Sequence, residues 1–147
     1  MKKATTFFIC ISMFMFLLPA LANAADGIKY ANGPLGFSLT LPSSWEGLYR
    51  VRERKSNMAD AVWVTFISIR NADAGYGGDV FSICISHEEL GDIPGTREIS
   101  RIGRKIAYSS GPSDVQFDHT NRTLSNEYNT MQNDVKTIIK TFRFVTP

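Results

Sequence analysis

Three arginines at alternate positions, Arg50, Arg52 and Arg54, form the pattern in this sequence that most directly suggests binding chemistry. They fall within residues 48–54, which are typical of a β-strand, and successive side chains of a strand point to opposite faces. We therefore expect the three guanidinium groups on one outward face and Tyr49 on the inward face. Such a row can hold a carboxylate or phosphate through paired hydrogen bonds. The alternative is a solvated strand face whose charges are matched by neighbouring acidic residues.

Aromatic side chains near the expected strand ends and turns can extend such a site: Tyr30, Trp45, Tyr49, Tyr76 and Tyr108. If they are exposed, they form a recognition patch. If they are buried, they belong to the core and keep only a polar tip near water. We take Trp45 and Tyr49, together with Arg50, Arg52 and Arg54, as the candidate ligand-binding residues. The expected partner is an unknown protein or a small anionic ligand.

The two histidines, His87 and His119, do not complete a recognisable catalytic or metal motif. Two glutamates follow His87, but the second histidine of the zinc-protease helix is missing at the required spacing. Asp114, Asp118 and His119 supply two carboxylates and one imidazole in a loop, a combination that is common by chance. A zinc site usually has three or four ligands that converge on the metal. We expect no catalytic residue, no metal and no cofactor. A small metal-dependent hydrolase built around His87, Asp118 and His119 remains an alternative.

Cys84 lies in a strand-like run of apolar residues, 80–85. We expect it to be a buried small side chain. The alternatives are an intermolecular disulfide or a reactive thiol, which would need a base or a cationic neighbour to lower its pKa. Cys10 lies within residues 1–24, which we interpret below as a cleaved leader. Cleavage would leave Cys84 as the one cysteine, so we expect no internal disulfide and a fold that depends on its hydrophobic core.

Residues 1–24 resemble a secretory signal peptide, with a basic start at Lys2 and Lys3 and an apolar run over residues 7–18. The run is shorter than the ~20 residues that cross a bilayer. Small residues before Ala24 predict cleavage after that residue. We therefore expect a secreted or extracytoplasmic protein without a membrane span after cleavage.

The chain has 147 residues, with 16 Lys and Arg against 14 Asp and Glu. Removal of the leader takes away two lysines and no acid, so the processed chain is neutral. A neutral chain has no electrostatic case for binding nucleic acid. The length predicts one domain, with a mobile lead-in over residues 25–34 and the folded domain over residues 35–147.

Clusters of glycine, asparagine and proline, which favour turns, recur every ten to fifteen positions, as is typical of strand-rich domains. Strands are expected over residues 36–41, 48–54, 61–69, 80–87 and 102–109, with a short extended piece at 115–117. Residues 71–78 are expected to form a hairpin loop and residues 88–98 a polar connection. Apolar residues from Leu124 to Phe142 recur at helical spacing, and Thr123 or Ser125 can cap this helix. The fold class is α+β, with one twisted antiparallel sheet of about five to six strands packed by a long C-terminal helix.

Residues 36–45, read as Gly-Phe-Ser-Leu-Thr-Leu-Pro-Ser-Ser-Trp, resemble the opening motif of PsbP/Mog1-like domains. The predicted helix over residues 124–142 is similar to the closing helix of that family. The resemblance implies an antiparallel sheet sandwiched by helices, a role as an accessory or binding module, and no shared catalytic residues. This sequence shows no clear helix for the second face of the sheet.

These observations favour a secreted, non-enzymatic binding or accessory domain of unknown ligand. The alternative is an extracytoplasmic inhibitor of a secreted enzyme, which would present a loop over residues 71–78 or 88–97 to its partner.

Overall fold

The computed structural model of the protein describes residues 27–57 and 59–145, so the expected leader over residues 1–24 lies outside the described residues. The elements follow in the order β1 (Ile28–Asn32), β2 (Phe37–Leu41), η1 (Ser43–Trp45), β3 (Tyr49–Lys55), β4 (Ala61–Ser68), α1 (Ile69–Asp73), β5 (Asp79–Ser86), β6 (Thr96–Ile102), β7 (Lys105–Ser110), α2 (Arg122–Lys140) and β8 (Arg143–Phe144). Among the described helices, none is both long and apolar enough to span a membrane.

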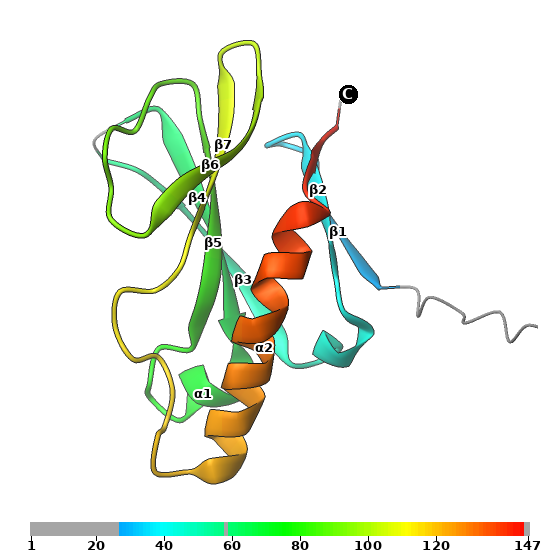
Figure 1. The fold of residues 1–147 in the computed structure, drawn as a ribbon, viewed down its shortest axis with the longest axis vertical. Helices are drawn as coiled ribbons and strands as arrows, with labels where there is room; N and C mark the ends of the chain where they lie inside the picture. The colour runs from blue at the N-terminus through cyan, green and yellow to red at the C-terminus, as the bar shows by residue number, and fades with distance from the viewer. Residues whose placement is uncertain (1–26, 58, 146–147) are drawn as a thin grey trace, which may run out of the picture.

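The strands form two antiparallel sheets (Figure 1). One has three strands in the order β1-β2-β8, and the other has five in the order β3-β4-β5-β7-β6. The predicted α+β class and antiparallel pairing are confirmed. The expected single sheet of five to six strands is replaced by two sheets, because β2 pairs with β1 and β8 and not with β3.

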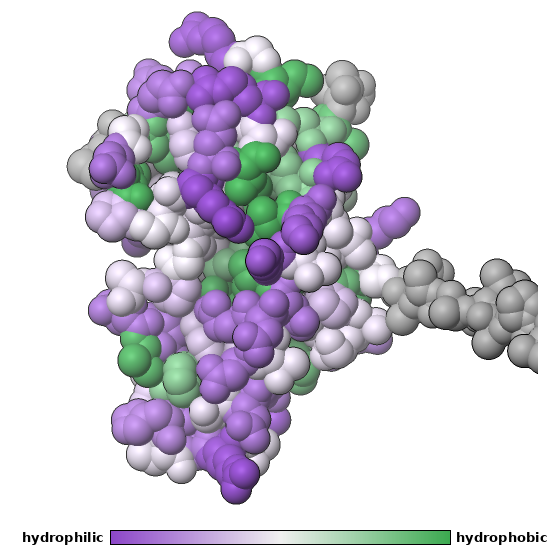
Figure 2. Space-filling view, in the orientation of Figure 1, coloured by the Kyte–Doolittle hydropathy of each residue, from purple (hydrophilic) through white to green (hydrophobic). Residues whose placement is uncertain are grey.

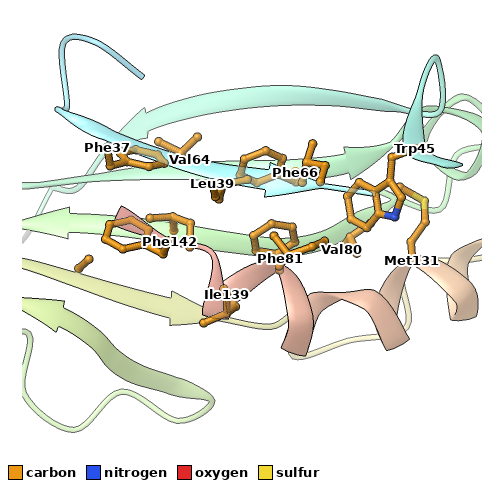
Figure 3. Close-up of a cluster of buried hydrophobic side chains, with 14 of the residues drawn as sticks. Phe37, Leu39, Trp45, Val64, Phe66, Val80, Phe81, Met131, Ile139 and Phe142 are labelled. Carbon is orange, nitrogen blue, oxygen red and sulfur yellow. The ribbon is translucent and has the colours of Figure 1, made fainter. Parts of the chain in front are cut away.

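The long helix α2 packs between the two sheets, and a shared hydrophobic core joins all three elements (Figures 1 and 3). Phe37 of the small sheet stacks on Phe142, just after α2, with ring centroids 5.5 Å apart. In the large sheet, Phe66 and Phe81 stack at 4.5 Å. Burial of these large rings removes much apolar surface from water, which is the main favourable term in folding.

The helix α2 has the single apolar stripe that the sequence predicts, with Leu124, Tyr128, Met131, Ile138 and Ile139 buried. Its first residue follows a cap that the sequence analysis did not choose. The side chain of Asn121 accepts hydrogen bonds from the backbone N–H groups of Thr123 and Leu124, at 3.1 and 3.2 Å. Asparagine is among the most favourable N-cap residues, because its side-chain oxygen can satisfy these free donors.

Two segments expected to be irregular contain strands. Residues 25–34, the expected mobile lead-in, contain β1, which pairs along its whole length with β2. Residues 88–98, the expected polar connection, contain the start of β6, which forms a hairpin with β7. The two residues between these strands include Gly103, whose φ of +58° suits a tight hairpin turn.

The expected hairpin loop over residues 71–78 is only partly a loop. The short helix α1 occupies its first part, and the fully buried Asn71 holds it in place. The Asn71 amide donates to Ser68 Oγ at 3.0 Å and to the carbonyl of Leu124 at 3.3 Å. A buried amide of this kind fixes neighbouring segments because its hydrogen-bonding groups must be satisfied.

Candidate functional site

The five-stranded sheet has α2 on one face, and we call the opposite face the open face. Part of the open face is covered by the loop after β5. Leu90 of this loop packs against a small cluster that contains Ala61, Cys84, Ile106 and Tyr108. The Tyr108 hydroxyl, in turn, donates to Glu89 of the same loop at 3.2 Å. The loop therefore shields the apolar part of the open face and leaves a polar part beside it.

The polar part carries four hydroxyl side chains from four neighbouring strands, which we call the hydroxyl row: Thr65, Ser82, Ser110 and Thr96. The register pairs Thr65 with Ser82, Ser82 with Ser110, and Ser110 with Thr96, so the row crosses β4, β5, β7 and β6. Thr65 Oγ1 lies 2.9 Å from Ser82 Oγ, and Thr96 Oγ1 donates to Ser110 Oγ at 3.2 Å. A hydroxyl both donates and accepts, so such a row can adapt to a polar ligand.

The three arginines of β3 lie on the open face, at one end of the hydroxyl row. Arg52 is directly opposite Thr65 in the register, and Arg54 is opposite Trp63. Arg52 binds both carboxylate oxygens of Asp79, at 2.8 and 3.1 Å. Arg50 binds Asp73 at 3.2 Å. Two of the three guanidinium groups are thus matched by aspartates, as the alternative of a neutralised strand face expects.

Arg54 differs from its two neighbours. Among the residues that the structure describes, no acidic side chain forms an ion pair with it. Together with Arg52, Asp79 and the half-buried Trp63, it borders a polar hollow of about 240 Å³. Three members of the hydroxyl row, Thr65, Ser82 and Ser110, also line this hollow. Arg50 does not border this hollow. The hollow therefore contains one guanidinium group that is available to an anion.

Trp45 and Tyr49 lie on the other side of the sheet from the arginines. Trp45 is 1% exposed and lies within the hydrophobic cluster (Figure 3). Its indole Nε1 donates to Asp134 Oδ2 of α2 at 3.0 Å. The half-buried Tyr49 packs beside Trp45 and Phe66, with ring centroids 6.0 and 6.1 Å away. Burial raises the pKa of the Tyr49 phenol. The structure thus does not bring these two aromatic residues together with the arginines.

Cys84 lies on the open face beneath the loop and is fully buried. Burial raises the pKa of its thiol to about 12. The nucleophilic form of cysteine is the thiolate, which this environment disfavours. The geometry matches the expected buried small side chain.

The residues of the hydrolase alternative lie far apart. His87 follows the last residue of β5, where its Nδ1 lies 3.3 Å from Asp60. Asp118 lies near the opposite end of β5: its backbone N–H donates to Asn71, and Gly78, just before β5, bonds to Gln116. An eight-residue strand spans roughly 25 Å, so His87 cannot reach Asp118. In the described part of the chain, no group of three or more potential metal ligands occurs.

Asp118 stabilises the loop before α2 through hydrogen bonds. Its Oδ1 accepts hydrogen bonds from the hydroxyl and backbone of Thr120, at 2.6 and 2.9 Å, and from the backbone of Asn121 at 3.2 Å. These bonds, with the Thr120 hydroxyl first, lower the pKa of the Asp118 carboxyl. A carboxylate used in this way orders the entry into the helix.

Sequence reasoning missed the residues that complete the hollow: Trp63, Thr65, Asp79, Ser82 and Ser110. A signal for them existed, because Thr65 and Ser82 are hydroxyl residues inside otherwise apolar strands. Whether these residues lie side by side depends on the strand order and on the register of the sheet. The sequence pattern alone provides neither.

Compared with protein-family models, with curated proteins and with solved structures, the chain matches none of them.

Proposed function

We propose that this chain is a non-enzymatic binding module, of the kind implied by its resemblance to PsbP/Mog1-like domains, and that its open face holds a small anionic ligand. One observation carries the proposal. Arg54 borders a polar hollow beside the hydroxyl row and has no acidic partner among the described residues. The leader-like residues 1–24 support a role outside the cytoplasm.

The chemistry of the hollow favours a carboxylate or phosphate group. Arg54 supplies a charge-assisted hydrogen bond, which is stronger than one between neutral groups. Thr65 and Ser82 line the hollow with Arg54, and whichever of their two hydroxyls accepts the bond between them keeps a proton that it can donate to a remaining oxygen. A volume of about 240 Å³ lies below the range of drug-sized sites and suits a small ligand.

The contacts within the hydroxyl row favour binding over catalysis. Thr65 and Ser82 are hydrogen-bonded to each other, while Ser110 receives a bond from Thr96 and donates to the carbonyl of Gly111. A nucleophilic hydroxyl needs a general base within hydrogen-bond reach. The described partners of these four residues are other hydroxyls and a backbone carbonyl, which are not bases.

The proposal is tested by NMR titration with inorganic phosphate and, separately, with a hexose phosphate. We expect shifts of the Trp63 indole and of the amides of Thr65, Ser82 and Ser110. The Arg54→Gln variant should bind about tenfold to a hundredfold more weakly, because a hydrogen bond to a charged group contributes about 1.5–3 kcal/mol.

Arg50→Gln is the matched control, since it removes the same charge from the same strand outside the hollow. It should leave the affinity unchanged. If both substitutions weaken the affinity equally, the loss reflects the total charge of the strand and not a contact between Arg54 and the ligand. Shifts absent at tens of millimolar phosphate and hexose phosphate would contradict the proposed site.

A further inference from the structure

A second recess lies on the other side of the molecule, between β6 and the end of α2 with β8. It is a groove of about 560 Å³, within the usual range of ligand sites. In Figure 1 the β6–β7 hairpin faces the point where α2 ends and β8 begins. Figure 2 shows apolar surface exposed at this point between hydrophilic borders.

The floor of the groove is apolar. Ile99 and Phe144 are half-buried, and Ile139 and Phe142 belong to the main core. At one end, Ile102 is 57% exposed and adds apolar surface to the groove. The parts of Ile99, Phe144 and Ile102 that are exposed to solvent gain free energy when an apolar group covers them.

The rim of the groove is basic. Arg97 and Arg101 border it on β6, and Lys140 and Arg143 border it at the end of α2. The lining residues include one carboxylate, that of Glu98, which Arg101 holds at 2.6 and 3.0 Å. Neither Arg97 nor Lys140 has an acidic partner within 4.0 Å among the described residues. The rim therefore has a surplus of positive charge available to an acidic ligand.

Two strand edges meet at this groove. β6 is the last strand of the five-stranded sheet, and β8 is the last strand of the three-stranded sheet. In the described part of the chain, no strand pairs with the outer edge of either one. An unpaired edge offers backbone N–H and C=O groups to an added strand, a common mode of peptide recognition.

We propose that the groove binds an extended peptide in which carboxylate side chains alternate with apolar ones. The apolar side chains lie on the floor, the carboxylates meet Arg97 and Lys140 at the rim, and the peptide backbone pairs with the edge of β6. The charge surplus selects an acidic partner, and the free strand edge favours a peptide over a lipid. This site is independent of the anion site on the open face, since the two share no lining residue.

The experiment measures the binding of a short, capped, fluorescent peptide in which valine alternates with glutamate. A peptide of valine and lysine and vesicles of phosphatidylglycerol serve as the competing ligands. We expect the glutamate peptide to bind and its affinity to fall as salt is raised, because exposed charges are screened. The double variant Arg97→Gln with Lys140→Gln should weaken binding about fivefold to tenfold.

The matched control is Lys136→Gln with Arg50→Gln, which removes the same net charge from exposed positions on α2 and β3 outside the groove. It should leave peptide affinity unchanged. The proposal is overturned if the lysine peptide binds equally well, or if neither peptide binds at millimolar concentration. It is also overturned if the vesicles bind in preference to the peptide, or if the chain dimerises through this groove and excludes the peptide.

Discussion

At the scale of single residues, burial decides the chemistry of Cys84. The thiol is enclosed by the sheet and by the loop that contains Leu90, and its pKa rises from 9.0 to about 12. Folding therefore depends on pH between these two values, a range in which tyrosines and lysines also titrate. Between pH 9 and 12 the thiol ionises readily in the unfolded chain but stays protonated in the folded one.

We predict that this difference in thiol pKa between the folded and unfolded states lowers the free energy of unfolding as the pH rises above 9. Below pH 9 the thiol is protonated in both states and has no such effect. Above pH 9 the unfolded state binds fewer protons, and the free energy of unfolding falls by up to about 1.4 kcal/mol per pH unit. Urea denaturation, followed by circular dichroism from pH 7 to 10.5, measures this loss. In Cys84→Ala, the part of the pH dependence that comes from the thiol is lost, whereas the part that comes from the buried tyrosines remains. The stability difference between the two proteins should therefore narrow above pH 9, and parallel curves would contradict the prediction.

The candidate site was predictable at the residue scale only in part. Alternation along residues 49–54 correctly puts Arg50, Arg52 and Arg54 on one face, and the same alternation separates them from Tyr49. Trp45 precedes the strand in a short 3₁₀ turn, so strand periodicity does not say where its ring points. Pairing of the arginines with Asp73 and Asp79 depends on the fold, because these residues are distant in sequence.

At the scale of elements, the start of α2 depends on Asn121. Its side-chain oxygen accepts from two of the free N–H groups of the first turn. We predict that Asn121→Ala lowers the free energy of unfolding by about 1 kcal/mol, the usual contribution of such a cap. Asn121→Asp retains the acceptor oxygen and should lower the free energy of unfolding much less. Thr123→Ala should also lower it less than Asn121→Ala does. Urea denaturation checks all three, and an equal loss in Asn121→Ala and Thr123→Ala would refute this assignment.

Two strands that the sequence analysis missed, β6 and β1, share a physical reason. The strand β6 has mostly polar residues, since it forms the edge of its sheet and has no strand to cover its outer side. The strand β1 is also an edge, and Asn32 is its one buried residue. Hydrophobic periodicity signals burial, so it finds central strands such as β4 and β5 and the stripe of α2 better than it finds edges.

At the scale of the whole molecule, the two sheets are joined by shared side-chain packing and by hydrogen bonds at the end of α2. Phe142 stacks on Phe37 of the small sheet and touches Phe144 edge-on, with ring centroids 5.2 Å apart. The Thr141 hydroxyl accepts from the backbone N–H of Thr40 at 2.8 Å. The core that contains Phe142 continues into Phe66 and Phe81 of the large sheet. The small sheet therefore has little apolar core of its own.

From this shared core we predict that both sheets unfold in one cooperative transition. Phe142→Leu leaves a small cavity at their junction and should cost about 1–2 kcal/mol. Native-state hydrogen exchange measures the effect strand by strand, and the slowest amides of β2 and β4 should lose the same free energy. Val115→Ala, at a position that is 66% exposed, is the control and should change neither sheet. Loss of protection in β2 alone would mean that the small sheet opens independently, so that the two sheets would not share one folding unit.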